Sequence, residues 1–81
     1  MIRLYVQIFQ KNQMKPSVQV HVPLPTVPQT EQEIPWFVME RLVKHGVTKQ
    51  QVGQILKKLR TPGSKIRLET PGHDVVVEIL K

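Results

Sequence analysis

Residues 48–60, TKQQVGQILKKLR, carry the pattern that most constrains how this chain folds. Apolar residues recur there at i, i+3, i+4 and i+7, the spacing that places side chains on one side of an α-helix. They are Val52, Ile55, Leu56 and Leu59. The segment is therefore predicted to form an amphipathic helix, which is stable only where other elements cover its apolar side.

The opposite side of this predicted helix is basic and rich in glutamine. It carries Lys49, Gln50, Gln54, Lys57, Lys58 and Arg60. No acidic residue interrupts it, which is typical of a surface that contacts a polyanion. A surface that serves only solubility has the same composition, so that alternative stays open.

The net charge of +6 is concentrated in one stretch of the sequence. Residues 41–68 contain eight lysines and arginines and no acid, whereas the charges of residues 1–40 cancel and residues 69–81 sum to −2. A basic stretch of this kind favours nucleic acid as a partner.

With 81 residues, the chain is predicted to form one domain around a small core built mostly from Val, Ile and Leu. The sequence has no cysteine, which excludes disulfides, thiolate nucleophiles and cysteine-based zinc sites. Polar residues interrupt residues 1–10, which do not resemble a secretory signal, and no apolar run is long enough to span a membrane. A cytoplasmic location is expected.

Alternation of apolar and polar residues predicts two β-hairpins. Their strands are expected at 2–9, 18–22, 65–69 and 75–80, with turns at 11–16 and 70–74. Prolines in residues 23–32 favour an extended connector between the first hairpin and the helices.

A first helix is predicted at 33–45, with Pro35 in its first turn and Gly46 at its end. Thr48 and Gln51 match a capping box that opens the second helix after a tight corner. The predicted fold class is α+β, a small single domain of order ββααββ. Its parts are an N-terminal hairpin (1–22), the connector (23–32), a helix pair (33–60) and a C-terminal hairpin (64–81).

The predicted core joins the first strand to the second helix. Its expected members are Ile2, Leu4, Val6, Ile8, Val52, Ile55, Leu56 and Leu59. The first helix is expected to bury Ile34, Trp36, Val38, Met39, Leu42 and Val43. Gly53 weakens a helix by about 1 kcal/mol relative to alanine, which indicates either close packing inside the fold or a close approach by a partner, and packing is the expected reason. Residues 2–8 are expected to form an open sheet edge, which favours a homodimer.

Residues 36–81 resemble the second half of a winged helix-turn-helix protein, with a helix, a Gly-Val-Thr corner, a basic second helix and a hairpin. In that superfamily the helix after the corner enters the major groove, and the hairpin contacts phosphates as a wing. The resemblance implies groove-facing residues at the start of the second helix, namely Lys49, Gln50, Gln51 and Gln54. It implies wing residues Lys65, Arg67 and His73.

The predicted function is that of a small nucleic-acid-binding protein, with DNA favoured over RNA. Glutamine can contact adenine N6 and N7, whereas lysine mainly supplies charge to phosphates. The predicted contact residues are Lys49, Gln50, Gln51, Gln54, Lys57, Lys58, Arg60, Lys65 and Arg67. The alternative is a non-enzymatic adaptor or inhibitor that binds an acidic protein surface or pairs through a strand edge.

Residues that bear catalytic or metal-binding chemistry are few and scattered. His21, His45 and His73 lack the short spacings of histidine metal ligands. Asp74 beside His73 is more typical of a turn than of a catalytic pair. The protein is therefore expected not to be an enzyme and to need neither a cofactor nor a metal.

Overall fold

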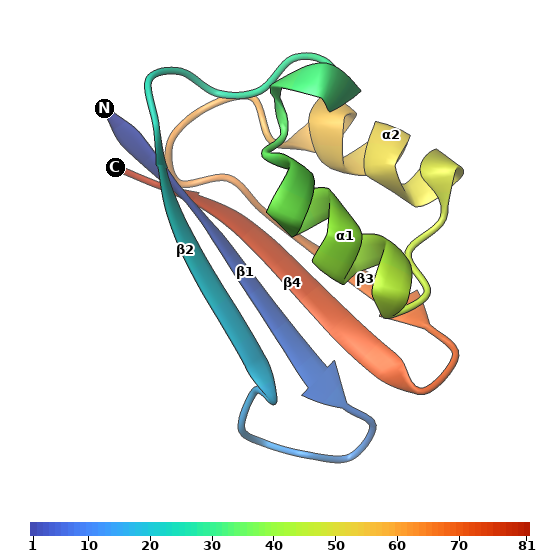
Figure 1. Cartoon of the computed structure of the whole chain (residues 1–81). Coiled ribbons are helices and arrows are strands. Elements are labelled where there is room, and N and C mark those ends of the chain that lie inside the picture. The colour runs from blue at the N-terminus through green and yellow to red at the C-terminus, as the bar shows by residue number, and fades with distance from the viewer.

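The two hairpins join into one sheet. The computed structural model describes residues 1–81, in which β1 (Ile2–Gln10) pairs with β2 (Val18–Leu24), and β3 (Lys65–Thr70) pairs with β4 (His73–Leu80). β1 and β4 also pair antiparallel, so the strand order is β2-β1-β4-β3 (Figure 1). The predicted α+β class and the order ββααββ are confirmed.

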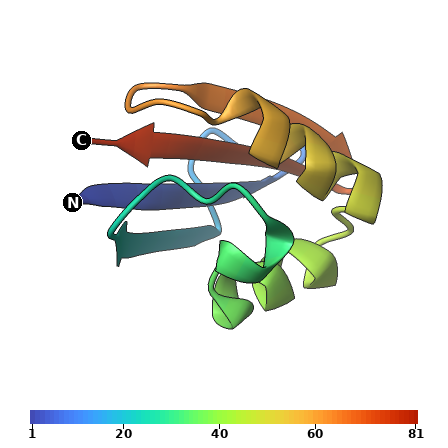
Figure 2. The same cartoon turned by 90° about the horizontal axis from the view of Figure 1, so that it is seen from above.

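Both helices lie on the same face of this sheet (Figure 2). α1 (Trp36–Lys44) and α2 (Lys49–Lys58) follow a short 3-10 turn, η1 (Glu31–Glu33), that ends the connector. Side chains alternate between the two faces of a strand, so every second residue of each strand points toward the helices. The other face of the sheet carries no helix.

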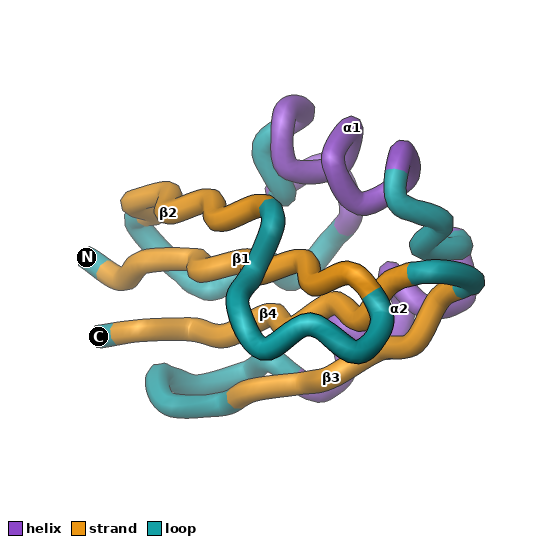
Figure 3. Tube along the Cα trace, turned by 90° about the horizontal axis from the view of Figure 1, so that it is seen from below, coloured by secondary structure: helices purple, strands orange, loops and turns teal.

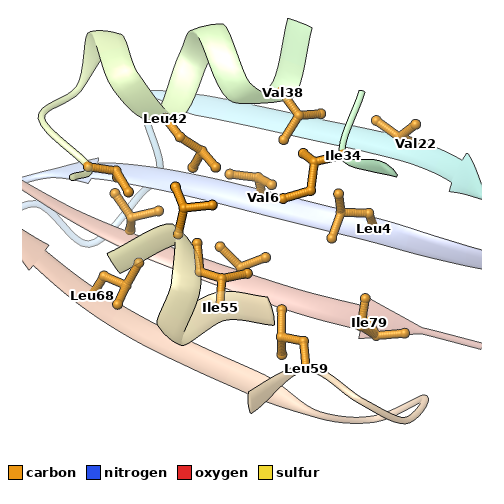
Figure 4. Packing of buried hydrophobic residues seen from close by; sticks show 14 of the residues in the cluster. Leu4, Val6, Val22, Ile34, Val38, Leu42, Ile55, Leu59, Leu68 and Ile79 are labelled. Atoms are coloured by element: carbon orange, nitrogen blue, oxygen red, sulfur yellow. The ribbon is translucent and has the colours of Figure 1, made fainter. Parts of the chain in front are cut away.

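The core fills the space between the sheet and the helices (Figure 4). Six of the residues predicted for it are buried: Leu4, Val6, Ile8, Val52, Ile55 and Leu59. Ile2 and Leu56 are only half-buried and pack against the rim of the cluster. Residues from β4 complete the core, and Val75 and Ile79 are fully buried. The shared core of the first strand and the second helix was therefore predicted correctly, apart from the burial of those two residues.

The first helix begins later than predicted, at Trp36 rather than at residue 33. Ile34 is extended, with φ −79° and ψ 126°, and Pro35 precedes the helix with ψ 140°. The ring of a proline disfavours helical geometry in the residue before it, so Ile34 interrupts the helix that the sequence pattern continues through. Pro35 is the N-cap, and its carbonyl oxygen accepts hydrogen bonds from the backbone N–H groups of Val38 and Met39.

The side of α1 that faces the sheet is narrower than predicted. Val38 and Leu42 are buried and Met39 is half-buried, as expected for residues that point at the sheet. Trp36 and Val43 were predicted to be buried, but they are 73% and 60% exposed. They lie at i and i+7, which places them together on a side of the helix that no other element covers.

The prediction that residues 2–8 form a sheet edge was wrong, because β1 is paired on both sides. The edges of the sheet are β2 and β3. β2 also continues beyond the predicted residue 22 to Leu24, with Pro23 inside it. An edge strand tolerates proline because one row of its backbone groups has no partner strand.

The corner between the helices was predicted correctly. Gly46 has φ +90°, the left-handed conformation that ends a helix. A Cβ on Gly46 would lie 3.3 Å from Cβ of Thr70, so this position also requires a residue without a side chain. The Thr70 hydroxyl donates a hydrogen bond to the backbone carbonyl of His45 at 2.9 Å, which ties the corner to the end of β3.

Candidate nucleic-acid interface

Helix α2 holds most of the predicted contact residues on one exposed surface. Burial of Val52 and Ile55 against the sheet orients the helix, and the opposite side then faces solvent. We call this surface the basic face; it comprises Lys49, Gln50, Gln54, Lys57 and Lys58 of α2, together with Arg60, all exposed. The helix ends at Lys58, earlier than the predicted residue 60, so Arg60 follows it after the C-cap Leu59. The structure therefore brings these six predicted residues together on the helix layer.

The cations of the basic face have no internal partner. The two salt bridges in the structure, Lys11–Asp74 and Arg67–Asp74, both end on the same carboxylate on the sheet. No acidic side chain lies within ion-pair distance of the lysines on α2 or of Arg60. Arg41 and Lys44, near the end of α1, are also exposed and unpaired. The helix layer thus presents unneutralised positive charge to solvent, which attracts polyanions.

Gln51, another predicted contact residue, is engaged inside the fold. Its side-chain oxygen accepts a hydrogen bond from the backbone N–H of Thr48 at 3.0 Å, as the predicted capping box requires. Its side-chain nitrogen donates to the backbone carbonyl of Glu69 at 2.9 Å. The carboxamide therefore links the start of α2 to β3, and both of its polar ends are used.

Lys65 and Arg67 lie on the other side of the molecule from the basic face. They alternate along β3 with Ile66 and Leu68, which point toward the helices, so their own side chains extend from the face that no helix covers. Arg67 donates a hydrogen bond to Asp74 at 3.3 Å. The hairpin that the resemblance assigns to a wing is half of the central sheet, because β4 is paired with β1.

Gly53 has no packing role, which contradicts the prediction. It lies midway along α2 on the exposed side, and a Cβ built on it would meet no atom within 4 Å. An alanine would fit there without displacing anything. The fold alone therefore gives no reason for glycine at this position.

The structure also brings together groups that sequence spacing did not indicate. The rings of His45 and His73 stand 4.9 Å apart, edge to face, although 27 residues separate them in the sequence. Tyr5 and His21 are neighbours across β1 and β2, with ring centroids 4.0 Å apart. No group of three or more His, Cys, Asp or Glu side chains converges in a way that could hold a metal ion.

Asp74 pairs with two cations on the sheet face opposite the helices. Its side chain is only 13% exposed and accepts a hydrogen bond from Lys11 at 2.9 Å. That hydrogen bond, together with the charges of Lys11 and Arg67, lowers the pKa of Asp74 below its ordinary value, against the opposing effect of burial. Asp74 therefore pairs with these two cations and does not contact the ring of the neighbouring His73 through a hydrogen bond.

Neither helix is long and apolar enough to cross a membrane. Comparison of the chain with models of protein families, with curated proteins and with solved structures finds no match.

Proposed function

We propose that the protein binds double-stranded nucleic acid, with DNA favoured, through the basic face of α2. The observation that carries this proposal is that the cations of this face are exposed and have no acidic partner within the fold. Phosphates of a duplex supply the missing counter-charge, and neutralising them releases condensed counterions.

Helix geometry assigns different roles to the residues of the basic face. Gln50 and Gln54 lie at i and i+4 on the outermost side of α2, where their carboxamides can reach base edges in a major groove. Lys57 lies beside them, Lys49 and Lys58 flank them, and Arg60 follows the end of α2. These four cations contact phosphates. Gln51 is left out of this set, because the fold already uses its side chain.

A second candidate function rests on the exposed apolar side of α1. Trp36 and Val43 share that side, and the Phe37 ring packs edge to face on Trp36 at 5.9 Å. Exposed tryptophan is enriched among the residues that dominate protein–protein binding energies. This surface suits a protein partner and would make the chain an adaptor.

Measurement of duplex affinity at several salt concentrations tests the first proposal. Replacing both Lys57 and Lys58 with alanine should weaken binding to all sequences and reduce the slope of log affinity against log salt by about 2. The control is the Lys15→Ala/Lys81→Ala double variant, which removes the same charge from exposed sites away from α2. Gln50→Ala should change the preference among sequences more than the overall affinity.

Two outcomes would overturn the proposal. One is wild-type protein that binds no duplex even at low salt, and the other is an equal loss of affinity in both double variants. If Trp36→Ala abolishes binding to a protein partner while duplex binding is absent, the adaptor function replaces the first proposal.

A further inference from the structure

The face of the sheet opposite the helices contains a cleft of about 520 Å³. The loop between β1 and β2, residues 11–17, crosses this face (Figure 3). The loop and the strands β1, β3 and β4 enclose the cleft between them. We call it the loop cleft. Its volume lies in the range of about 300 to 1,000 Å³ that is typical of ligand sites.

Hydrogen bonds hold the loop in place at both ends. At its start, Lys11 binds the Asp74 carboxylate through its side chain and the Gly72 carbonyl oxygen through its backbone N–H. At its end, the backbone N–H of Ser17 donates to the carbonyl oxygen of Ile8 at 2.8 Å. Asn12 adopts φ +66°, a left-handed conformation that asparagine tolerates better than most residues. The cleft is therefore formed in the free protein.

The lining of the loop cleft combines three kinds of chemistry. Phe9 and Val76 supply apolar surface on the sheet. Gln7, Asn12 and Gln13 supply carboxamides. None of these three carboxamides forms a hydrogen bond within the protein. Lys65 and Arg67 supply positive charge.

Among the residues that line the cleft, the two cations Lys65 and Arg67 outnumber the one carboxylate, Asp74. Glu78 lies opposite Lys65 on β4 but forms no ion pair with it. Asp74 is shared between Lys11 and Arg67, whereas Lys65 has no ion pair. Arg67 donates one hydrogen bond to Asp74, at 3.3 Å, and its guanidinium group has further N–H donors. Lys65 and Arg67 thus retain capacity for an anionic group at the β3 side of the cleft.

We propose that the loop cleft binds an unpaired nucleotide of a single-stranded nucleic acid. The base lies against Phe9, the free carboxamides hydrogen-bond its edge, and a phosphate contacts Lys65 and Arg67. A base within a duplex is stacked and paired, so it does not present its face to such a cleft. This site is separate from the basic face of α2, which lies on the other side of the sheet.

A titration with an unlabelled single-stranded oligonucleotide tests the proposal. NMR chemical shifts of the protein monitor the binding. Shifts should concentrate at Phe9, Gln13 and Lys65. Lys65→Ala and Gln13→Ala should each weaken binding, Lys65→Ala by about tenfold, because each removes a hydrogen bond and the former also removes a charge. Lys15→Ala is the matched control, since it removes a charge from the same loop at a residue that does not line the cleft.

The alanine variant of Lys57 and Lys58 separates this site from the proposed duplex interface. It should retain the oligonucleotide shifts at Phe9 and Gln13 while duplex binding falls. A mononucleotide that binds the cleft as tightly as the oligonucleotide would overturn the single-strand assignment in favour of a free nucleotide. Wild-type protein without shifts in the cleft at low salt, or a Lys65→Ala variant with unchanged affinity, would overturn the site itself.

Discussion

Gly53 is a residue at which the fold should gain stability from a side chain, because it lies exposed in the middle of α2. Glycine inside a helix costs about 0.5 to 1 kcal/mol relative to alanine, and a Cβ at this position would contact nothing. Gly53→Ala should therefore raise the free energy of unfolding by about that amount. Urea denaturation measures this change, and a loss of stability would contradict the exposed position of Gly53 on α2.

The same variant tests whether a duplex approaches α2 closely. If the nucleic-acid backbone passes next to Gly53, an added methyl group weakens duplex binding although it stabilises the protein. Gln10→Ala is the control, because it changes an exposed, uncharged residue outside the basic face. A Gly53→Ala protein that is more stable and binds duplex as tightly as wild type would show that no close approach occurs at this residue.

Gly46→Ala should have the opposite effect on stability from the same chemical change at Gly53. Gly46 has φ +90°, and a Cβ there would stand 3.3 Å from Cβ of Thr70. Both the backbone conformation and the close contact oppose a side chain, so we expect a loss of more than about 1 kcal/mol. Comparing the urea midpoints of the two alanine variants measures the difference, and equal midpoints would contradict this account of the corner.

Sequence patterns predicted the residues whose roles are set within a few positions of the chain. Gly46 ends α1, and Thr48 caps α2 with Gln51, because these roles depend on local backbone geometry. Trp36 and Gly53 were predicted wrongly, since their surroundings depend on which neighbouring element covers them. Nothing in the sequence near either residue indicates that no element does.

At the scale of elements, the Gln51 side chain makes one hydrogen bond within the cap of α2 and one to the second hairpin. Gln51→Ala removes both the cap on Thr48 and the bond to the Glu69 carbonyl, so we expect a loss of about 1 to 2 kcal/mol. Gln51→Glu keeps an acceptor for the Thr48 N–H but loses the donor to the Glu69 carbonyl. Its thermal denaturation midpoint should therefore lie between those of wild type and Gln51→Ala. Wild-type stability in Gln51→Ala would show that these bonds contribute nothing net.

The β1–β2 loop and the second hairpin are joined through Asp74, which makes their contact sensitive to pH. The pKa of Asp74 is lower in the folded protein than in the unfolded chain, chiefly because of its hydrogen bond from Lys11. A carboxylate with a lowered pKa stabilises the fold above its unfolded pKa of about 4, and this stabilisation is lost as the pH falls through the folded value.

Asp74→Asn isolates this contribution. The variant should be less stable than wild type at about pH 6, and the difference should begin to shrink as the pH falls below about 4, the unfolded pKa of the carboxyl group. It should disappear only below the lowered pKa of folded Asp74, where both proteins carry an uncharged side chain at this position. Urea midpoints measured across this range provide the test. A difference that stays constant from neutral to acidic pH would show that Asp74 acts through its shape and not through its charge.

The hairpins themselves were predictable, but the way in which they pair was not. Alternating residues and the Pro-Gly turn define β3 and β4 locally. The pairing of β1 with β4 joins the two ends of the chain, and no local signal specifies it. For this reason the sequence indicated a sheet edge at β1. Likewise, Lys65 and Arg67 were grouped with the contact residues of the second helix, although they lie on the other side of the sheet.

At the scale of the whole molecule, the first and last strands hold the fold together at its centre. β1 and β4 are the inner strands, and their inward residues Val6, Ile8 and Ile79 are fully buried. Each helix covers part of the same core, so neither hairpin has a complete core by itself. The chain is therefore expected to unfold as one cooperative unit.

Two truncations in this core should have clearly different costs. Ile79 is fully buried in β4, so Ile79→Ala should lower the free energy of unfolding by about 2 to 5 kcal/mol. A domain of this size has a total stability of only about 4 to 12 kcal/mol, so that loss removes a large part of it. Leu56 is half-buried at the edge of the core, beside a small apolar cavity, and Leu56→Ala should cost less than about 2 kcal/mol.

Guanidinium denaturation followed by far-ultraviolet circular dichroism measures both variants against wild type, and a single transition in each supports cooperative unfolding. If Leu56→Ala destabilises the protein as much as Ile79→Ala, Leu56 points into the core. The helix would then be rotated, and the basic face that this rotation exposes would no longer consist of Lys49, Gln50, Gln54, Lys57, Lys58 and Arg60. From the burial of these side chains, we expect the free energy of unfolding of Ile79→Ala to be clearly lower than that of Leu56→Ala.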